Sequence, residues 1–219
     1  NMKNYLESKL YLFKKLIKKG GNIITDANIP QSKKIIDISK KKKLNINLIF
    51  KKEGIELISH KFLKEKQILE IKYYNRKYLI ELNLIGKIQI KNILMAILAA
   101  NKSGLKFEKI INVIHRLKSV EGRLEKIGKI KNNSKVILDY AHTPEALKLA
   151  LLNLKEQFPM SKISLVFGCG GNRDFKKRSI MGKIAEKYSD QIYLTDDNPR
   201  YENPTKIRKD IKKGINKSK

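Results

Sequence analysis

Cysteine and acidic residues are scarce in this chain of 219 residues, and long apolar runs are missing. A single cysteine, Cys169, excludes an internal disulfide and fits a reducing cytosol. No apolar run approaches the roughly 18 residues that a membrane span needs. The first residues also lack the apolar core of a secretory signal. We therefore expect a cytoplasmic protein with no membrane span.

The shortage of acid leaves the chain strongly basic, with 49 Lys and Arg against 21 Asp and Glu and a net charge of +28. Such a balance usually suggests nucleic acid or anionic lipid as a partner. Only seven of the basic residues are arginine, however, and the 42 lysines occur in every segment, interleaved with Ile and Asn. A nucleic-acid footprint would instead cluster on one face beside exposed aromatic residues. We expect no nucleic-acid partner; a basic nucleic-acid-binding module, testable by a salt-dependent gel shift, is the alternative from another functional class.

The first part of the sequence alternates between helical and β-rich patterns. Apolar residues at helical spacing predict helices, and short alternating runs bounded by charged or Gly-containing turns predict strands. The predicted helices cover residues 2–19, 30–41, 88–102 and 107–118, and the predicted strands cover 22–25, 44–50, 55–58, 68–74 and 78–85.

The polar turn Lys131–Lys135 marks the expected domain boundary, which gives domains of residues 1–130 and 131–219. Beyond it, strands and helices alternate, with strands at 136–138, 163–167 and 192–195. This alternation predicts an α/β fold with a Rossmann-like, mainly parallel sheet. Thr143, Pro144 and Glu145 are typical of a helix N-terminus, because they supply a hydroxyl cap, a proline at the first position and an acid in the first turn.

The most informative segment is the loop Asp197-Asn198-Pro199-Arg200, which follows the third of these strands. Open α/β sheets bind ligands at the carboxyl ends of their strands. This loop offers a carboxylate, an amide, a rigid turn and a guanidinium. Together these groups suit a small zwitterion, with its carboxylate on the arginine and its ammonium on the aspartate. A solvated Asn-Pro turn is the alternative.

Three further motifs precede this loop: Gly122–Glu125, Asp139–His142 and the glycine-dense Gly168–Asp174. With the Asp-Asn-Pro-Arg loop, their order and spacing resemble the Mur ligases, and specifically the members that add diaminopimelate. The resemblance covers nearly the whole chain and is strongest from Gly122 to Pro204. It implies part of the family's central ATPase domain, followed by its Rossmann-like C-terminal domain.

The resemblance also implies roles for individual residues. Arg173, Asp197, Asn198, Pro199 and Arg200 are expected to bind meso-diaminopimelate. The residues expected to bind ATP are Asn92, Arg123, Asp139 and His142. At two positions the chain departs from the family pattern, with Gln89 in place of an asparagine near adenine and Asn172 in place of an aspartate.

Lys9, in the first predicted helix, matches a family lysine that becomes a carbamate and helps hold a magnesium ion. Oxygen ligands suit magnesium, and carbamate formation needs an amine whose pKa is depressed, as burial would cause. One solvated helix lysine among 42 is the alternative reading of Lys9.

The implied activity is an ATP-dependent amide-bond ligation in cytoplasmic peptidoglycan precursor synthesis, with ATP as co-substrate and magnesium as cofactor. The expected partners are ATP, UDP-MurNAc-dipeptide and meso-diaminopimelate, and the expected state is a monomer. Other Mur-type ligases (lysine-adding, folylpolyglutamate or cyanophycin synthetases) are the alternatives within the family. The sequence has no Gly-x-x-Gly-Lys-Thr loop, so we expect a piece of a longer protein, inactive by itself.

Four of the seven arginines, namely Arg123, Arg173, Arg178 and Arg200, lie in or beside these motifs. A lysine-rich sequence should keep arginine where a planar, bidentate donor is required. We predict that Arg173→Lys and Arg200→Lys each lower the activity of the complete enzyme, although the charge is retained. Unchanged steady-state activity in both variants would remove the basis for this interpretation.

Overall fold

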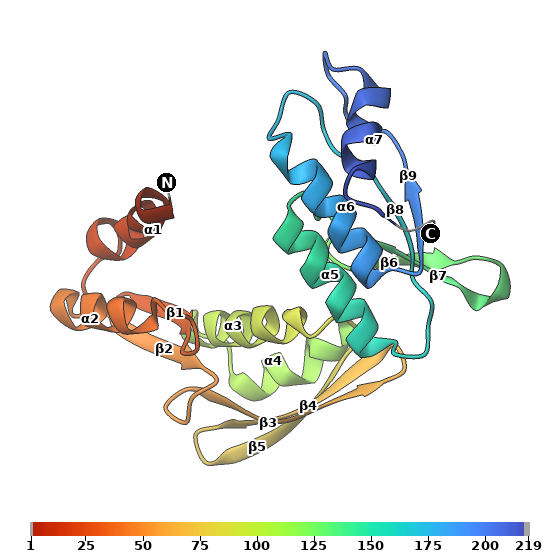
Figure 1. Cartoon of the computed structure of the whole chain (residues 1–219). Coiled ribbons are helices and arrows are strands. Elements are labelled where there is room, and N and C mark those ends of the chain that lie inside the picture. Colours follow the sequence, from red (N-terminus) through yellow and green to blue (C-terminus); the bar gives the residue numbers. More distant parts are fainter. Residues whose placement is uncertain (1, 217–219) are drawn as a thin grey trace. The chain divides into compact units, whose positions relative to one another are not determined.

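The computed structural model describes residues 2–216 (Figure 1), and the chain divides into two compact units, Asn1–Lys118 and Ser119–Lys219. The polar turn expected to mark the boundary, Lys131–Lys135, lies inside the second unit, twelve residues after this division. It connects β6 (Glu125–Lys129) and β7 (Lys135–Leu138), which pair with each other through antiparallel hydrogen bonds. Because the two strands pair, the turn between them is a hairpin connection.

The first unit is built on a five-stranded mixed sheet in the order β1-β2-β3-β4-β5. β1 (Asn22–Asp26), β2 (Asn45–Ile49) and β3 (Ile55–Leu63) run parallel, whereas β4 (Lys66–Tyr73) and β5 (Arg76–Leu82) continue as an antiparallel meander. The β-rich pattern between residues 44 and 85 is thus confirmed.

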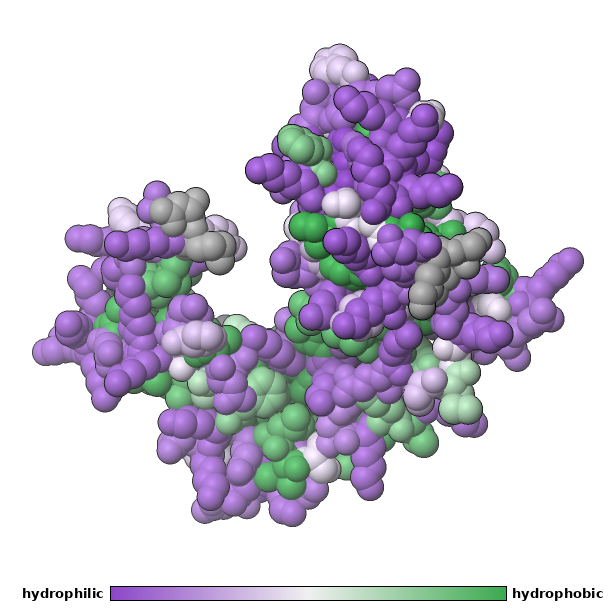
Figure 2. Space-filling view, viewed as in Figure 1, coloured by the Kyte–Doolittle hydropathy of each residue, from purple (hydrophilic) through white to green (hydrophobic). Residues whose placement is uncertain are grey.

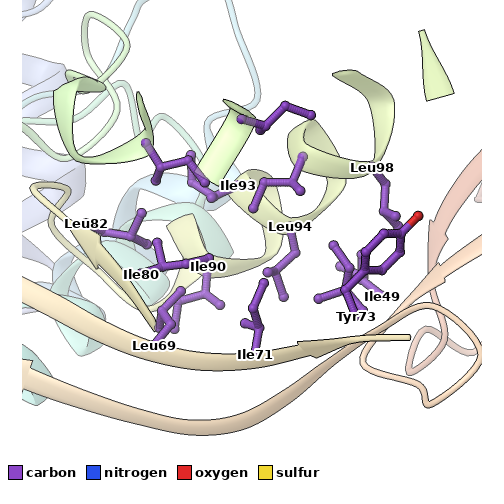
Figure 3. Packing of buried hydrophobic residues seen from close by; sticks show 14 of the residues in the cluster. Ile49, Leu69, Ile71, Tyr73, Ile80, Leu82, Ile90, Ile93, Leu94 and Leu98 are labelled. Atoms are coloured by element: carbon purple, nitrogen blue, oxygen red, sulfur yellow. The ribbon is translucent and has the colours of Figure 1, made fainter. Parts of the chain in front are cut away.

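The main core of the first unit lies between this sheet and α3 (Ile88–Lys102) (Figure 3). α3 buries one apolar stripe at helical spacing, made of Ile90, Ile93, Leu94, Ile97 and Leu98. The stripe faces alternate residues of the strands, such as Leu69 and Ile71 of β4 (Figure 3). α4 (Phe107–Val113) completes this layer, and its first residue stacks on Tyr73 with the ring centroids 4.1 Å apart.

A second cluster covers the other face of β1, because successive side chains of a strand point to opposite faces. Ile23 packs with Leu10, Ile35 and Ile38, whereas its neighbour Ile24 packs against the main core. The covering elements are α1 (Met2–Tyr11), the π-helical turn Leu12–Leu16 and α2 (Ser32–Lys42). The α-helical part of the helix predicted over residues 2–19 therefore ends at Tyr11, and the chain widens into this π-helical turn.

The second unit alternates strands and helices as predicted. After β7 come α5 (Pro144–Gln157), β8 (Ser164–Phe167), α6 (Lys176–Tyr188), β9 (Gln191–Leu194) and α7 (Pro204–Lys212) (Figure 1). The Thr143 hydroxyl caps α5 by accepting from the Ala146 amide at 3.3 Å. β8 and β9 pair in parallel, which confirms the predicted parallel arrangement for these two strands, whereas β7 pairs antiparallel with β6.

The core of the second unit lies between the β8–β9 pair and its helices. Leu147 and Leu151 of α5, Met181 of α6, and Ile207 and Ile211 of α7 form its buried centre. The loops that follow β8 and β9 leave this core at the carboxyl ends of the strands, the edge at which parallel sheets bind ligands.

Hydrophilic side chains cover most of the face shown in Figure 2. In the part of the chain that the structure describes, no helix is both long enough and apolar enough to cross a membrane.

Candidate active site

The glycine loop (residues 168–174) and the Asp-Asn-Pro-Arg loop (residues 197–200) lie against each other after β8 and β9. The Gly171 amide donates to the Asn198 carbonyl at 2.8 Å. In return, Nη1 of Arg200 donates to the Gly171 carbonyl at 2.7 Å. Two motifs whose bonded residues, Gly171 and Arg200, are 29 positions apart in the sequence therefore form one hydrogen-bonded edge.

The glycines are required because the two backbones touch. A Cβ added at Gly171 would lie 1.9 Å from the Pro199 carbonyl oxygen, and one at Gly168 would lie 2.4 Å from the Thr195 carbonyl oxygen. Real Cβ atoms do not approach a backbone oxygen so closely, so any larger residue would push the loops apart.

The Asp-Asn-Pro-Arg loop holds a tight turn with an unusual backbone at its arginine. The Asn198 side chain accepts from the Arg200 amide at 3.2 Å, Pro199 fixes the intervening φ, and Arg200 has φ of 49°. A non-glycine residue in this left-handed region costs about 1 kcal/mol. The hydrogen bonds of the loop hold Arg200 there and direct its guanidinium towards the glycine loop.

Asn172 makes the second set of contacts between the loops. Its side-chain oxygen accepts from the Tyr201 amide at 3.1 Å, and its own amide donates to Glu202 at 2.5 Å. Its φ of 50° lies in the left-handed region, which asparagine and aspartate tolerate better than most residues. Asparagine thus suits the position at which the family pattern has aspartate.

Two side chains of opposite charge remain available at this edge. Arg173 and Asp197 are exposed, and neither has a hydrogen-bond or ion-pair partner within residues 2–216. The neighbouring Asp196 differs, because it pairs with Arg208. An exposed cation and an exposed anion beside Arg200 are what a zwitterionic amino acid would require.

Cys169 lies within the glycine loop but points into the core. It is buried, and its sulfur lies 3.7 Å from that of Met181. Burial raises the pKa of the Cys169 thiol and so opposes formation of the thiolate. Cys169 therefore has a packing role.

Arg178 is one of the four arginines in or beside the motifs, but the sequence did not predict its partners. It is 1% exposed, and its guanidinium contacts the Glu202 carboxylate at 2.9 Å and the Asp210 carboxylate at 3.2 Å. Burial alone would lower the pKa of Arg178, but these two carboxylates raise it. The pKa of Glu202 is lowered by the Asn172 amide and by Arg178. The presence of an arginine at this position in a lysine-rich chain was the sequence feature that could have indicated its structural importance.

A second cluster gathers three of the residues expected near ATP. The Asp139 carboxylate accepts from the Leu124 amide at 2.9 Å, which fixes the Gly122–Glu125 turn beside the end of β7. The Arg123 guanidinium lies 5.6 Å from the centre of the Tyr140 ring, and that ring lies 5.2 Å from the His142 ring. Tyr140 was not predicted, and it joins Arg123 and His142 in an exposed aromatic and cationic surface.

Asn92, the fourth residue expected near ATP, belongs to the first unit. Its side chain is exposed on α3 and donates to Gln89 at 3.2 Å. Gln89 is buried, so the longer amide that departs from the family pattern also orients Asn92.

Lys9 is exposed on α1, with its ammonium 5.4 Å from the centre of the Tyr5 ring. Carbamate formation calls for a buried lysine, but the first unit leaves Lys9 exposed. The nearest acidic residue in sequence, Glu7, is held by Lys14 and Lys34, which lower its pKa to about 2. Among the described residues no group of three or more His, Cys, Asp or Glu side chains could hold a metal ion. These residues do not by themselves form a magnesium site.

Comparison with known proteins agrees with the motifs. Residues 1–100 match the Mur ligase middle domain, and residues 122–219 match the Mur ligase glutamate ligase domain. The chain belongs to the Mur ligase family. The resemblance inferred from the motifs is thereby confirmed.

One similar relative of this Mur ligase chain is the UDP-N-acetylmuramoyl-L-alanyl-D-glutamate–2,6-diaminopimelate ligase of Rickettsia montanensis. The two are 38% identical over 216 residues, covering 98% of this chain and 44% of the relative. The chain therefore spans less than half the length of the relatives it matches.

Two solved structures show the shared fold. A UDP-N-acetylmuramoyl-L-alanyl-D-glutamate–2,6-diaminopimelate ligase has a TM-score of 0.66 and 25% identity, covering 99% of this chain and 44% of that one. Folylpolyglutamate synthase of Thermotoga maritima has a TM-score of 0.77 and 22% identity, covering 99% of this chain and 50% of that one. The second likeness concerns the fold alone.

We predict that Gly171→Ala destabilises the second unit, because the new Cβ would force the Pro199 carbonyl away and break the bond to Asn198. Overpacking of this kind costs about 1–3 kcal/mol, measurable as a lower midpoint of thermal unfolding. Gly128→Ala is the matched control, since a Cβ there meets nothing within 4 Å. Equal effects of the two substitutions would contradict the close contact between the loops.

Proposed function

We propose that this chain is part of an ATP-dependent ligase that adds meso-2,6-diaminopimelate to UDP-N-acetylmuramoyl-L-alanyl-D-glutamate in cytoplasmic peptidoglycan precursor synthesis. The observation that carries the proposal is the joined pair of loops after β8 and β9, where Arg200 donates to Gly171. The name of the Rickettsia relative, which matches over nearly the whole chain, supports the same activity.

The amino-acid substrate is proposed to lie at the edge formed by these loops. Arg173 and Arg200 would each hold a carboxylate, and Asp197 would hold an ammonium group. Asn198 and Pro199 set the turn that presents Arg200. Lysine has no second carboxylate, so the two arginines favour diaminopimelate over lysine.

ATP is proposed to contact the cluster of Arg123, Asp139 and His142, together with Asn92 of the first unit. The guanidinium of Arg123 is suited to a phosphate group. Asp139 follows a strand and precedes the N-terminus of α5, an arrangement that favours ribose or phosphate.

The proposed reaction has two steps. The D-glutamyl carboxylate of the UDP-linked substrate attacks the γ-phosphorus of ATP, which gives an acyl phosphate and ADP. The amine of diaminopimelate then attacks the acyl carbon, so that an amide bond forms and phosphate leaves. Fixed cations that neutralise the meeting anions and hold them close lower the barrier.

The remaining contributions to this reaction stay proposals from the family. Magnesium would screen the phosphate charges, and Lys9, as a carbamate, is the residue of this chain proposed to help hold it. We also propose that the protein is a monomer with small-molecule substrates and no nucleic-acid partner, since its lysines are spread over every segment.

Arg200 is the residue that tests the proposed substrate. We predict that Arg200→Ala in the complete protein raises the KM for meso-diaminopimelate by about 10- to 100-fold, the loss expected for a hydrogen bond to a charged group of roughly 1.5–3 kcal/mol. The preference for diaminopimelate over lysine should fall with it, and both are measured by steady-state kinetics.

Arg76→Ala is the control, because Arg76 is an exposed arginine of the first unit that pairs only weakly, with Glu108 at 3.4 Å. Its KM should match that of the unsubstituted protein. An unchanged KM in Arg200→Ala would refute the assignment, and a preference for lysine in the unsubstituted protein would favour another Mur-type ligase.

A further inference from the structure

Arg178 of α6 is buried where three separate segments meet. Its Nη2 contacts the Glu202 carboxylate at 2.9 Å and the Gly170 carbonyl at 3.4 Å, while its Nη1 contacts Asp210 of α7 at 3.2 Å. One guanidinium thereby joins the glycine loop, the segment just after the Asp-Asn-Pro-Arg loop, and α7. Its Nε is buried and has no hydrogen-bond partner among residues 2–216.

Glu202 extends this contact to the opposite loop. One of its carboxylate oxygens accepts from Arg178, and the other accepts from the Asn172 amide at 2.5 Å. Its own amide donates to the Pro199 carbonyl at 3.0 Å. Glu202 is therefore attached to both loops, and Arg178 holds its carboxylate in place.

Polar contacts hold the outer part of the two loops. Residues 172–174 and 196–198 are exposed, and so are Arg200 and Tyr201, so they lie outside the buried core of the second unit. Direct loop-to-loop hydrogen bonds involve Gly171 and Asn172. A buried, doubly paired guanidinium is rigid in comparison, because an uncompensated charge in the interior is strongly unfavourable.

We infer that Arg178 is a positioning residue for the amino-acid substrate. Through Glu202 it sets the register of the glycine loop against the Asp-Asn-Pro-Arg loop, and hence the spacing of Arg173 and Arg200. This inference rests on the function proposed above. It assigns to the Arg178–Glu202 pair a role in selecting a ligand with two separated carboxylates.

Lysine cannot take over this role, even though the chain uses it almost everywhere else. The planar guanidinium directs separate nitrogens at Glu202 and Asp210 at the same time, whereas an ammonium is a single point of charge. Arg178→Lys therefore keeps the charge and the burial of the stem while losing the fixed geometry.

The first test is kinetic and uses Arg178→Lys in the complete protein. We expect the KM for meso-diaminopimelate to rise at least 10-fold while the KM for ATP stays within about twofold, since the ATP residues lie in a different cluster. Leu151→Ala is the control for lost stability alone, because it removes buried core atoms of α5 and leaves the hydrogen bonds of both loops in place. It should lower the unfolding midpoint and leave both KM values unchanged.

Two further variants separate the arms of the guanidinium. Glu202→Gln removes the arm that reaches the loops and should reproduce the rise in KM. Asp210→Asn removes the arm that reaches α7 and should mainly lower the unfolding midpoint.

In combination with Arg200→Ala, Arg178→Lys should add little to the KM, because both substitutions remove the same binding interaction. Full additivity would overturn the inference.

A second measurement needs no substrate and so separates this inference from the proposed function. Amide hydrogen exchange at Gly171, Asn172 and Tyr201 should be faster in Arg178→Lys and Glu202→Gln than in the unsubstituted protein, with exchange in the α5 core unchanged. Unchanged exchange at these three amides would overturn the role of Arg178. Absence of diaminopimelate ligation by the unsubstituted protein would overturn only the proposed function.

Discussion

The second unit depends on the direct contact of two backbones at the ends of β8 and β9. Gly171 lies so close to Pro199 that no side chain fits between them, and each loop satisfies backbone groups of the other. This contact sets the backbone positions from which the side chains of Arg173, Asp197 and Arg200 extend. The buried guanidinium of Arg178, which is paired with Glu202 and contacts Gly170, aligns the two loops. The candidate site is therefore a property of main-chain packing as much as of its charged side chains.

Patterns formed by residues close together in the sequence predicted much of the fold. The stripe Ile90, Ile93, Leu94, Ile97 and Leu98 predicts α3 because residues three and four apart share a helix face, and the structure confirms its bounds. Thr143 predicts the start of α5 because its hydroxyl replaces a missing helical hydrogen bond. Contacts between distant segments could not be predicted in this way. The pairing of β6 with β7 and the partners of Arg178, up to 32 residues away, exist only once the chain has folded.

The same limit applies to the candidate site. The sequence identified the motif residues, but it did not reveal that Arg200 donates to Gly171 or that the Tyr140 ring lies near both Arg123 and His142. Lys9 shows the opposite case, because the proposed carbamate calls for a burial that the first unit does not supply. Arginine in a chain with 42 lysines is an informative residue. Arg178 and Arg200 each contact more than one group at once, which a lysine would do less well.

The central claim is that the two loops hold an amino acid with two carboxylates between Arg173 and Arg200. A crystal structure of the complete protein with meso-diaminopimelate tests it most directly. We predict one carboxylate within hydrogen-bond distance of each guanidinium and an ammonium group beside Asp197, with the Gly171–Asn198 and Arg178–Glu202 contacts intact. A ligand bound elsewhere, or Arg173 and Arg200 directed apart with no carboxylate between them, would contradict it.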